Sequence, residues 1–328
     1  MCRIWVRGIV TAGLTLSSAA FAQVEEPADS TATGDNCIES CASVDDQERW
    51  LDRSHRYVSN RADDVAQWMD RFFGVRRAEL EAANSSLRLQ LGYDWDEVDA
   101  STEARLRGKL YLPRISERVS LVFSDEDETD LDSESLDQIV RNQEDSNSVS
   151  LEYNLTDEPD RRMDIRVGLR DIYKIKTAFR YRYLQPYGDN NLGRYTEELY
   201  FLDGEGFGTL TRLELDHLID SRRLLRWSNR FRYSEDTHGV DWGTKLSLRT
   251  RAASNSAISY YAFYNGETHP QLITDYGLGF SFRHRFYREW LFYEVEPTYS
   301  WRRDTLEDDR EGVAGIALRL ELVLEADL

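Results

Sequence analysis

Apolar and polar residues alternate with a period of two along most of the chain. Leu87, Leu89 and Leu91 are apolar, whereas the intervening Arg88 and Gln90 are polar. This alternation is typical of a β-strand with one apolar and one polar face. Similar segments recur about fourteen times from residue 85 to the end, and several contain about ten residues, which is enough to cross a bilayer at a tilt.

The connections between the predicted strands differ in length. Residues 219–222 and 251–256 are short links, whereas residues 125–147 and 302–312 are long and acidic. A soluble β-sandwich also alternates, but it does not require short turns at one end and long loops at the other. That asymmetry is typical of membrane barrels, so we expect an all-β fold, a closed antiparallel transmembrane β-barrel of about 14 strands, within a range of about 12 to 16.

Aromatic residues on the apolar parity lie near the predicted strand ends, among them Trp95, Tyr233, Trp242 and Trp301. Their amphipathic rings suit the headgroup level of a membrane, which favours the barrel over the sandwich. The alternation is least regular near residue 200, where Glu197 falls on the apolar parity.

The first residues indicate export from the cytoplasm. Arg3 and Arg7 precede a short apolar stretch that ends at Ala20-Phe21-Ala22. This is the pattern of a secretory signal peptide over residues 1–22, and the apolar stretch is too short for a membrane anchor.

Residues 23–46 are acidic, rich in Ser and Thr, and without periodicity, which predicts a flexible leader. They contain Cys37 and Cys41, which we expect to form a disulfide in an oxidising compartment. A metal site is the alternative, but His55 is the nearest further ligand and zinc needs more.

The segment 47–84 has helical spacing and precedes the first predicted strand. Its apolar stripe includes Trp50, Val58, Val65, Trp68 and Phe72. Such an amphipathic helix needs an apolar surface to lie against. It could enter the barrel as a plug, contact the barrel mouth or bind a periplasmic partner. We favour the mouth or a partner, because Trp and Phe suit an apolar surface better than an arginine-lined interior.

The remaining composition narrows the function. Asp and Glu number 60 against 41 Lys and Arg, for a net charge of −19. A nucleic-acid partner is therefore not expected, because phosphate binding needs a basic surface. No phosphate-binding loop or dinucleotide fingerprint occurs, and the acidic loop after residue 124 lacks the EF-hand spacing. We expect neither a cofactor nor a metal ion.

The signal peptide, the repeated alternating strands and the terminal strand 315–328 resemble the Gram-negative outer-membrane β-barrel superfamily. In that superfamily an aromatic residue usually ends the chain, whereas Leu328 keeps the alternation without a ring. The helical segment is similar to the leader of uncharacterised proteobacterial barrel proteins, a likeness that implies no activity. The resemblance implies an outer-membrane location with the N-terminal segment in the periplasm. It also implies contact with outer-membrane lipid and lipopolysaccharide, and recognition by the barrel-assembly machinery.

If the apolar parity faces lipid, the other parity lines the interior, where basic residues outnumber acidic ones. The predicted basic lining consists of Arg88, Arg105, Arg107, Lys109, Arg166, Arg180, Arg182, Arg212, Arg226, Arg230, Arg232, Lys245, Arg249, Arg283 and Arg319. A passive pore that favours small anionic solutes is one hypothesis. The alternative is a structural or assembly barrel, closed by ion pairs across the lumen, that binds a periplasmic partner through its helix.

An outer-membrane lipid-modifying enzyme is a third, weaker hypothesis. It needs a nucleophile with a nearby histidine at the lipid-facing rim. His238 and His269 lie in predicted outer loops, but neither belongs to a recognisable motif with a serine. We therefore expect a protein without enzymatic activity.

Overall fold

The computed structural model describes residues 63–73, 85–112, 118–125, 147–158, 160–170, 173–188, 190–236 and 239–326. The predicted signal peptide, the leader with Cys37 and Cys41, and the residues Trp50 and Val58 lie outside these ranges. Within them, no helix is both long and apolar enough to cross a bilayer.

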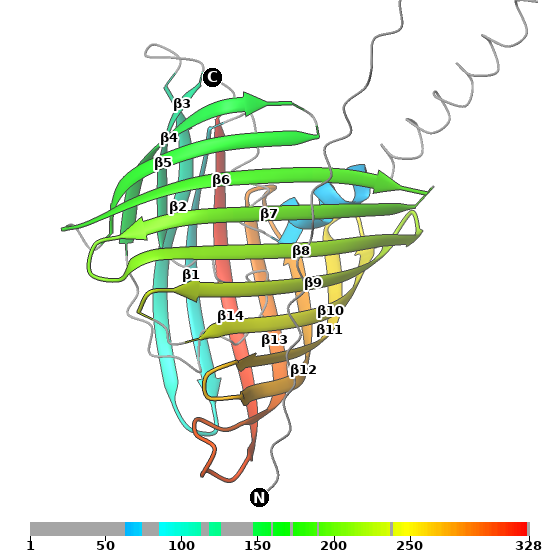
Figure 1. Ribbon diagram of the computed structural model, residues 1–328. Coiled ribbons are helices and arrows are strands. Elements are labelled where there is room, and N and C mark those ends of the chain that lie inside the picture. Colours follow the sequence, from blue (N-terminus) through cyan, green and yellow to red (C-terminus); the bar gives the residue numbers. More distant parts are fainter. Residues whose placement is uncertain are drawn as a thin grey trace, which may run out of the picture. The chain divides into compact units, whose positions relative to one another are not determined.

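The described residues form fourteen antiparallel strands that close into a barrel (Figure 1). The strands are β1 (Ser85–Asp96), β2 (Ala100–Tyr111), β3 (Val119–Asp125), β4 (Asn147–Asp157), β5 (Arg161–Arg170), β6 (Lys174–Tyr187), β7 (Asn191–Leu202), β8 (Gly206–Asp220), β9 (Arg223–Ser234), β10 (Val240–Ala253), β11 (Ser256–Glu267), β12 (Leu272–Arg285), β13 (Leu291–Arg302) and β14 (Glu311–Ala326). Each pairs with its sequence neighbours, and β1 pairs with β14 from Ser85↔Ala326 to Asp96↔Gly315. The predicted closed barrel of about fourteen strands is confirmed.

Side chains separate by parity around the ring. In β1, Leu91 is 44% exposed and Trp95 is 43% exposed, whereas Arg88 and Gln90 are buried. The same alternation of exposed and buried positions runs along β5, β9 and β13. The apolar residues therefore point outwards and the charged residues inwards. This arrangement is the reverse of that in a soluble protein, and it suits a barrel surrounded by lipid.

Aromatic residues form a continuous band on the outer face of β10 to β13. The ring of Tyr264 lies 5.5 Å from Trp242 and 5.8 Å from Tyr276, and Tyr276 lies 5.3 Å from Trp301. All four occur near the same end of their strands. This is the expected place for a ring belt at the membrane–water boundary.

The two ends of the barrel differ less than the sequence suggested. The terminal end carries the start of β1, the end of β14 and two-residue turns such as 221–222 and 254–255. The opposite loop end carries the long link 126–146, but also three-residue links such as 97–99 and 203–205. The asymmetry in loop length is therefore real but partial.

Glu197 explains the irregular alternation in β7. Its outward carboxylate accepts hydrogen bonds from the hydroxyl groups of Tyr195 at 2.9 Å, Thr209 at 2.5 Å and Thr211 at 2.8 Å. A carboxylate on a lipid-facing surface is costly unless it is hydrogen-bonded. The neighbouring hydroxyl groups therefore let β7 keep its register despite the misplaced charge.

Candidate functional site in the barrel interior

All fifteen predicted basic residues lie on the inward parity of the barrel. Arg105, Arg212, Arg230 and Arg232 are half-buried, and the other eleven are buried. The burial of these eleven means that neighbouring side chains, and not an open water column, surround them.

One set of inward charges joins three strands, β2, β4 and β5. Glu152 contacts the Lys109 ammonium at 2.8 Å and the guanidinium groups of Arg166 at 2.9 Å and Arg162 at 3.3 Å. Neither Lys109 nor Glu152 has exposed side-chain surface. We call Lys109, Glu152, Arg162 and Arg166 the wall cluster, because every member belongs to a barrel strand.

Further ion pairs join adjacent or next-adjacent strands on the inner face of the wall. They include Arg182–Asp164 at 2.7 Å, Arg180–Glu198 at 2.8 Å, Arg283–Glu321 at 2.8 Å, Arg283–Glu294 at 3.0 Å and Arg319–Glu296. Buried charges are tolerated when they are paired and hydrogen-bonded. The basic lining is therefore largely matched by carboxylates on neighbouring strands.

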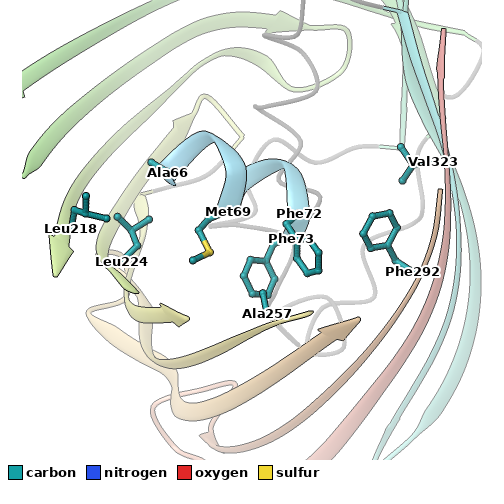
Figure 2. Close-up of a cluster of buried hydrophobic side chains, with 9 residues drawn as sticks. All are labelled: Ala66, Met69, Phe72, Phe73, Leu218, Leu224, Ala257, Phe292 and Val323. Carbon is teal, nitrogen blue, oxygen red and sulfur yellow. The ribbon is translucent and has the colours of Figure 1, made fainter. Parts of the chain in front are cut away.

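The helix over residues 63–73 packs against the inner wall (Figure 2). Its buried members are Ala66, Met69, Phe72 and Phe73, and the wall contributes Leu218, Leu224, Ala257, Phe292 and Val323. These wall residues lie on the inward parity and close to the terminal end of the barrel. The helix therefore occupies the lumen at that end.

Aromatic rings and guanidinium groups both contribute to the contact between the helix and the wall. Phe72 lies 5.6 Å from Phe292 in an edge-to-face arrangement and stacks on Trp68 at 4.8 Å. The guanidinium of Arg251 lies 4.2 Å from the centre of the Trp68 ring, and that of Arg249 lies 5.3 Å from the Phe73 ring. Such cation–π contacts are favourable, and more so when water is excluded.

These contacts correct the sequence-based preference for a mouth or partner contact over a plug. Val65, Trp68 and Phe72 do lie at one barrel mouth, but inside the wall, where Phe72 is buried and the other two are partly buried. The sequence predicts an arginine-lined interior, which is expected to suit aromatic rings less well than an apolar surface. Inward apolar residues and stacked guanidinium groups make this interior compatible with them.

Asp70 is the charged group of the helix that faces the wall. Its carboxylate accepts hydrogen bonds from Arg249 at 2.9 Å, from Arg226 at 3.1 Å and from Arg194 at 3.3 Å. These arginines belong to β10, β9 and β7, and Asp70 is only 3% exposed. We call Asp70, Arg194, Arg226 and Arg249 the helix cradle.

Sequence reasoning missed several residues of this site. Arg162 and Arg194 were not assigned to the lining, and Asp70 was not singled out within the helix. The inward leucines had a readable signal, since Leu218-Ile219 and Leu224-Leu225 interrupt the alternation beside a turn. Two adjacent apolar residues in a strand place one of them on each face.

The structure adds little to the enzyme hypothesis. His238 lies outside the described residues, and His269 lies in the 268–271 link at the loop end. His217 contacts Asn191 through Nδ1 at 2.8 Å. In the described part of the chain, no group of three or more His, Cys, Asp and Glu side chains could hold a metal ion.

A groove of about 810 Å³ lies on the outer face over β9 to β13. Its lining includes Trp227, Leu246, Tyr264, Leu278 and Trp301. These side chains belong to the lipid-facing parity, so acyl chains would cover the groove in a bilayer. The interior is therefore the better candidate for a specific function.

A closed antiparallel barrel with an apolar exterior and a charged interior defines the class of transmembrane β-barrels of the outer-membrane type. Among solved structures, the chain is similar to OprB of Pseudomonas putida in its low-pH structure, with 14% identity, a TM-score of 0.45 and coverage of 78% of this chain and 98% of that one. It is also similar to OmpT, an outer membrane protein of Vibrio cholerae, with 7% identity, a TM-score of 0.43 and coverage of 74% and 97%. For the NanC porin the identity is 7%, the TM-score 0.38 and the coverage 72% and 98%. No family model matches the chain, and no curated protein does.

Proposed function

We propose that the protein is an outer-membrane channel for small anionic solutes that the 63–73 helix closes at rest. The observation that carries this proposal is the helix cradle, where three arginines of the wall bind a carboxylate from a separate segment. Inward basic residues lower the barrier for anions once the lumen is free. The N-terminal segment would lie in the periplasm, and insertion by the barrel-assembly machinery into a lipopolysaccharide-containing membrane is part of the proposal.

The barrel does not depend on the helix for closure. Every strand, including the first and the last, has two hydrogen-bonded strand neighbours without it. The described helix contacts the wall through side chains, such as Asp70, Met69 and Phe72, and through the carbonyl group of Arg71, which accepts a hydrogen bond from the Arg88 side chain at 3.4 Å. Undocking of the helix would therefore leave the ring of backbone hydrogen bonds intact.

Single-channel recording in planar bilayers tests this function. The intact protein is expected to be mostly silent, whereas Asp70→Asn is expected to give stable openings with reversal potentials that indicate anion preference. Asp64→Asn is the matched control, because Asp64 is an exposed acid on the same helix. A silent Asp70→Asn protein, or an equally open Asp64→Asn protein, would contradict the proposal.

The second candidate function is a closed structural barrel of the envelope. The buried wall cluster and the other interior ion pairs favour it, because they neutralise inward charges of the wall independently of the helix. Under this alternative, release of the helix would expose a binding surface for a periplasmic partner, and the barrel would show no conductance. The same recordings, made on protein whose helix is shown to be released, separate the two functions.

A further inference from the structure

Three guanidinium groups from different strands converge on one carboxylate in the helix cradle. Arg226 contributes two contacts to Asp70, one to each carboxylate oxygen, while Arg249 binds Oδ1 and Arg194 binds Oδ2. Both oxygen atoms are therefore held by donors of the wall. The planar, forked guanidinium matches the geometry of a carboxylate, which makes such contacts selective as well as strong.

Two of these arginines are held in place by the wall itself. Asp216 of β8 accepts hydrogen bonds from Arg226 Nε at 2.6 Å and Nη2 at 3.0 Å, and it contacts Arg194 Nη1 at 2.9 Å. These contacts do not involve the helix. Arg194 and Arg226 would therefore stay oriented if Asp70 left, and a preorganised site loses less entropy on binding a ligand.

We propose that Arg194, Arg226 and Arg249 form a carboxylate-binding site, that Asp70 occupies this site at rest, and that a solute with a carboxylate group displaces Asp70 and so releases the helix. This inference extends the proposed channel function, because it names the class of solute that opens the channel. The carboxylate of Asp70 acts as an internal copy of the solute group.

The charge balance of the site supports a single incoming carboxylate. Without Asp70, Arg194 and Arg226 still contact the carboxylate of Asp216, and Arg249 is the third guanidinium group of the site. Loss of Asp70 therefore removes one negative charge from a site that three guanidinium groups line. Burial strengthens the attraction of these groups for a replacement anion, because little water screens them.

Chemical rescue by acetate tests the site in the full-length protein in detergent. Asp70→Ala removes the internal carboxylate, and its thermal unfolding midpoint is expected to rise and then saturate as acetate increases from about 1 to 100 mM. Sodium chloride at the same ionic strength controls for screening. Asp64→Ala, an exposed change on the same helix, is expected to show no response specific to acetate.

A second measurement uses the wild-type chain, so its result does not depend on whether the Asp70→Ala variant folds. Acetate is expected to increase the rate of trypsin cleavage after Arg71, relative to sodium chloride, because it competes with Asp70 and undocks the helix. The double variant Asp70→Ala/Arg226→Gln is expected to lose the acetate response of the midpoint.

The absence of a saturable acetate effect in both measurements would overturn the inference. Acetate binding without conductance would support the site and contradict the channel function. Conductance of Asp70→Asn with no acetate effect in either measurement would support the channel and overturn the site.

Discussion

The wall cluster and the helix cradle contain the same chemistry in different structural settings. Each buries one carboxylate among three basic side chains. In the wall cluster, all four residues belong to strands whose backbones are hydrogen-bonded to their neighbours. In the helix cradle, the carboxylate belongs to a helix outside the sheet.

This difference separates a structural ion pair from a reversible one. The wall cluster lies between strands that the sheet holds at a fixed spacing, so its charges stabilise the barrel. The helix cradle can open while every strand pair stays intact, so its charges control the position of one segment. Substitutions in the wall cluster are expected to change the free energy of unfolding. Substitutions in the helix cradle are expected to change whether the helix occupies the lumen.

The largest stability effect is expected for Glu152→Gln in the wall cluster. Removal of the carboxylate leaves three buried cations without their shared partner, which is expected to lower the free energy of unfolding by about 3–5 kcal/mol. Chemical denaturation in detergent measures this loss. Asp160→Asn is the control, because its pair with Arg161 is exposed and such pairs are worth about 0–1 kcal/mol. Equal losses in the two variants, or channel openings in Glu152→Gln, would remove the distinction between the two regions.

A smaller effect, confined to the helix, is expected for Phe72→Ala. The change removes the contacts with Phe292 and Trp68 and is expected to weaken docking by about 3 kcal/mol, while the unfolding of the barrel stays nearly unchanged. Trypsin cleavage after Arg71, followed by mass spectrometry, reports the undocked population, which should increase roughly a hundredfold. Gln67→Ala alters an exposed position of the same helix and should leave cleavage slow. Similar cleavage in both variants would show that the apolar contact does not hold the helix.

The smallest effect is expected for Arg251→Gln. Loss of the cation–π contact with Trp68 is expected to cost about 0.5–1 kcal/mol, which corresponds to a roughly two- to fivefold increase in cleavage after Arg71. Arg223→Gln is the comparison, because Arg223 lies at the same end of the barrel with an exposed side chain paired to Asp220. If both variants leave cleavage unchanged, the stacked guanidinium does not contribute to docking.

The fold could be predicted because a lipid-facing barrel imposes one rule on every strand. In β14, for example, Ile316, Leu318 and Leu320 point outwards while Arg319 and Glu321 are buried inside. The rule has a period of two and depends on nothing outside the strand. The number of strands and the assignment of basic residues to the inward parity follow from it directly.

The helix cradle could not be predicted, because it joins residues that are far apart in the sequence. Asp70 and Arg249 are separated by 179 positions, and strand parity places Arg249 in the lining without indicating its partner. The position of the helix inside the lumen also differs from the sequence-based expectation, because composition alone does not show that Leu224 and Phe292 line the terminal end of the lumen. Packing between distant segments decides both features, whereas strand periodicity is local.

Hydrogen exchange of residues 63–73 in the folded protein tests most directly whether Asp70 holds the helix inside the lumen. The account predicts slow amide exchange in the wild-type chain and in Asp64→Asn, and fast exchange in Asp70→Asn, with unchanged protection of the strands. Fast exchange in the wild-type chain, or equally slow exchange in Asp70→Asn, would contradict it.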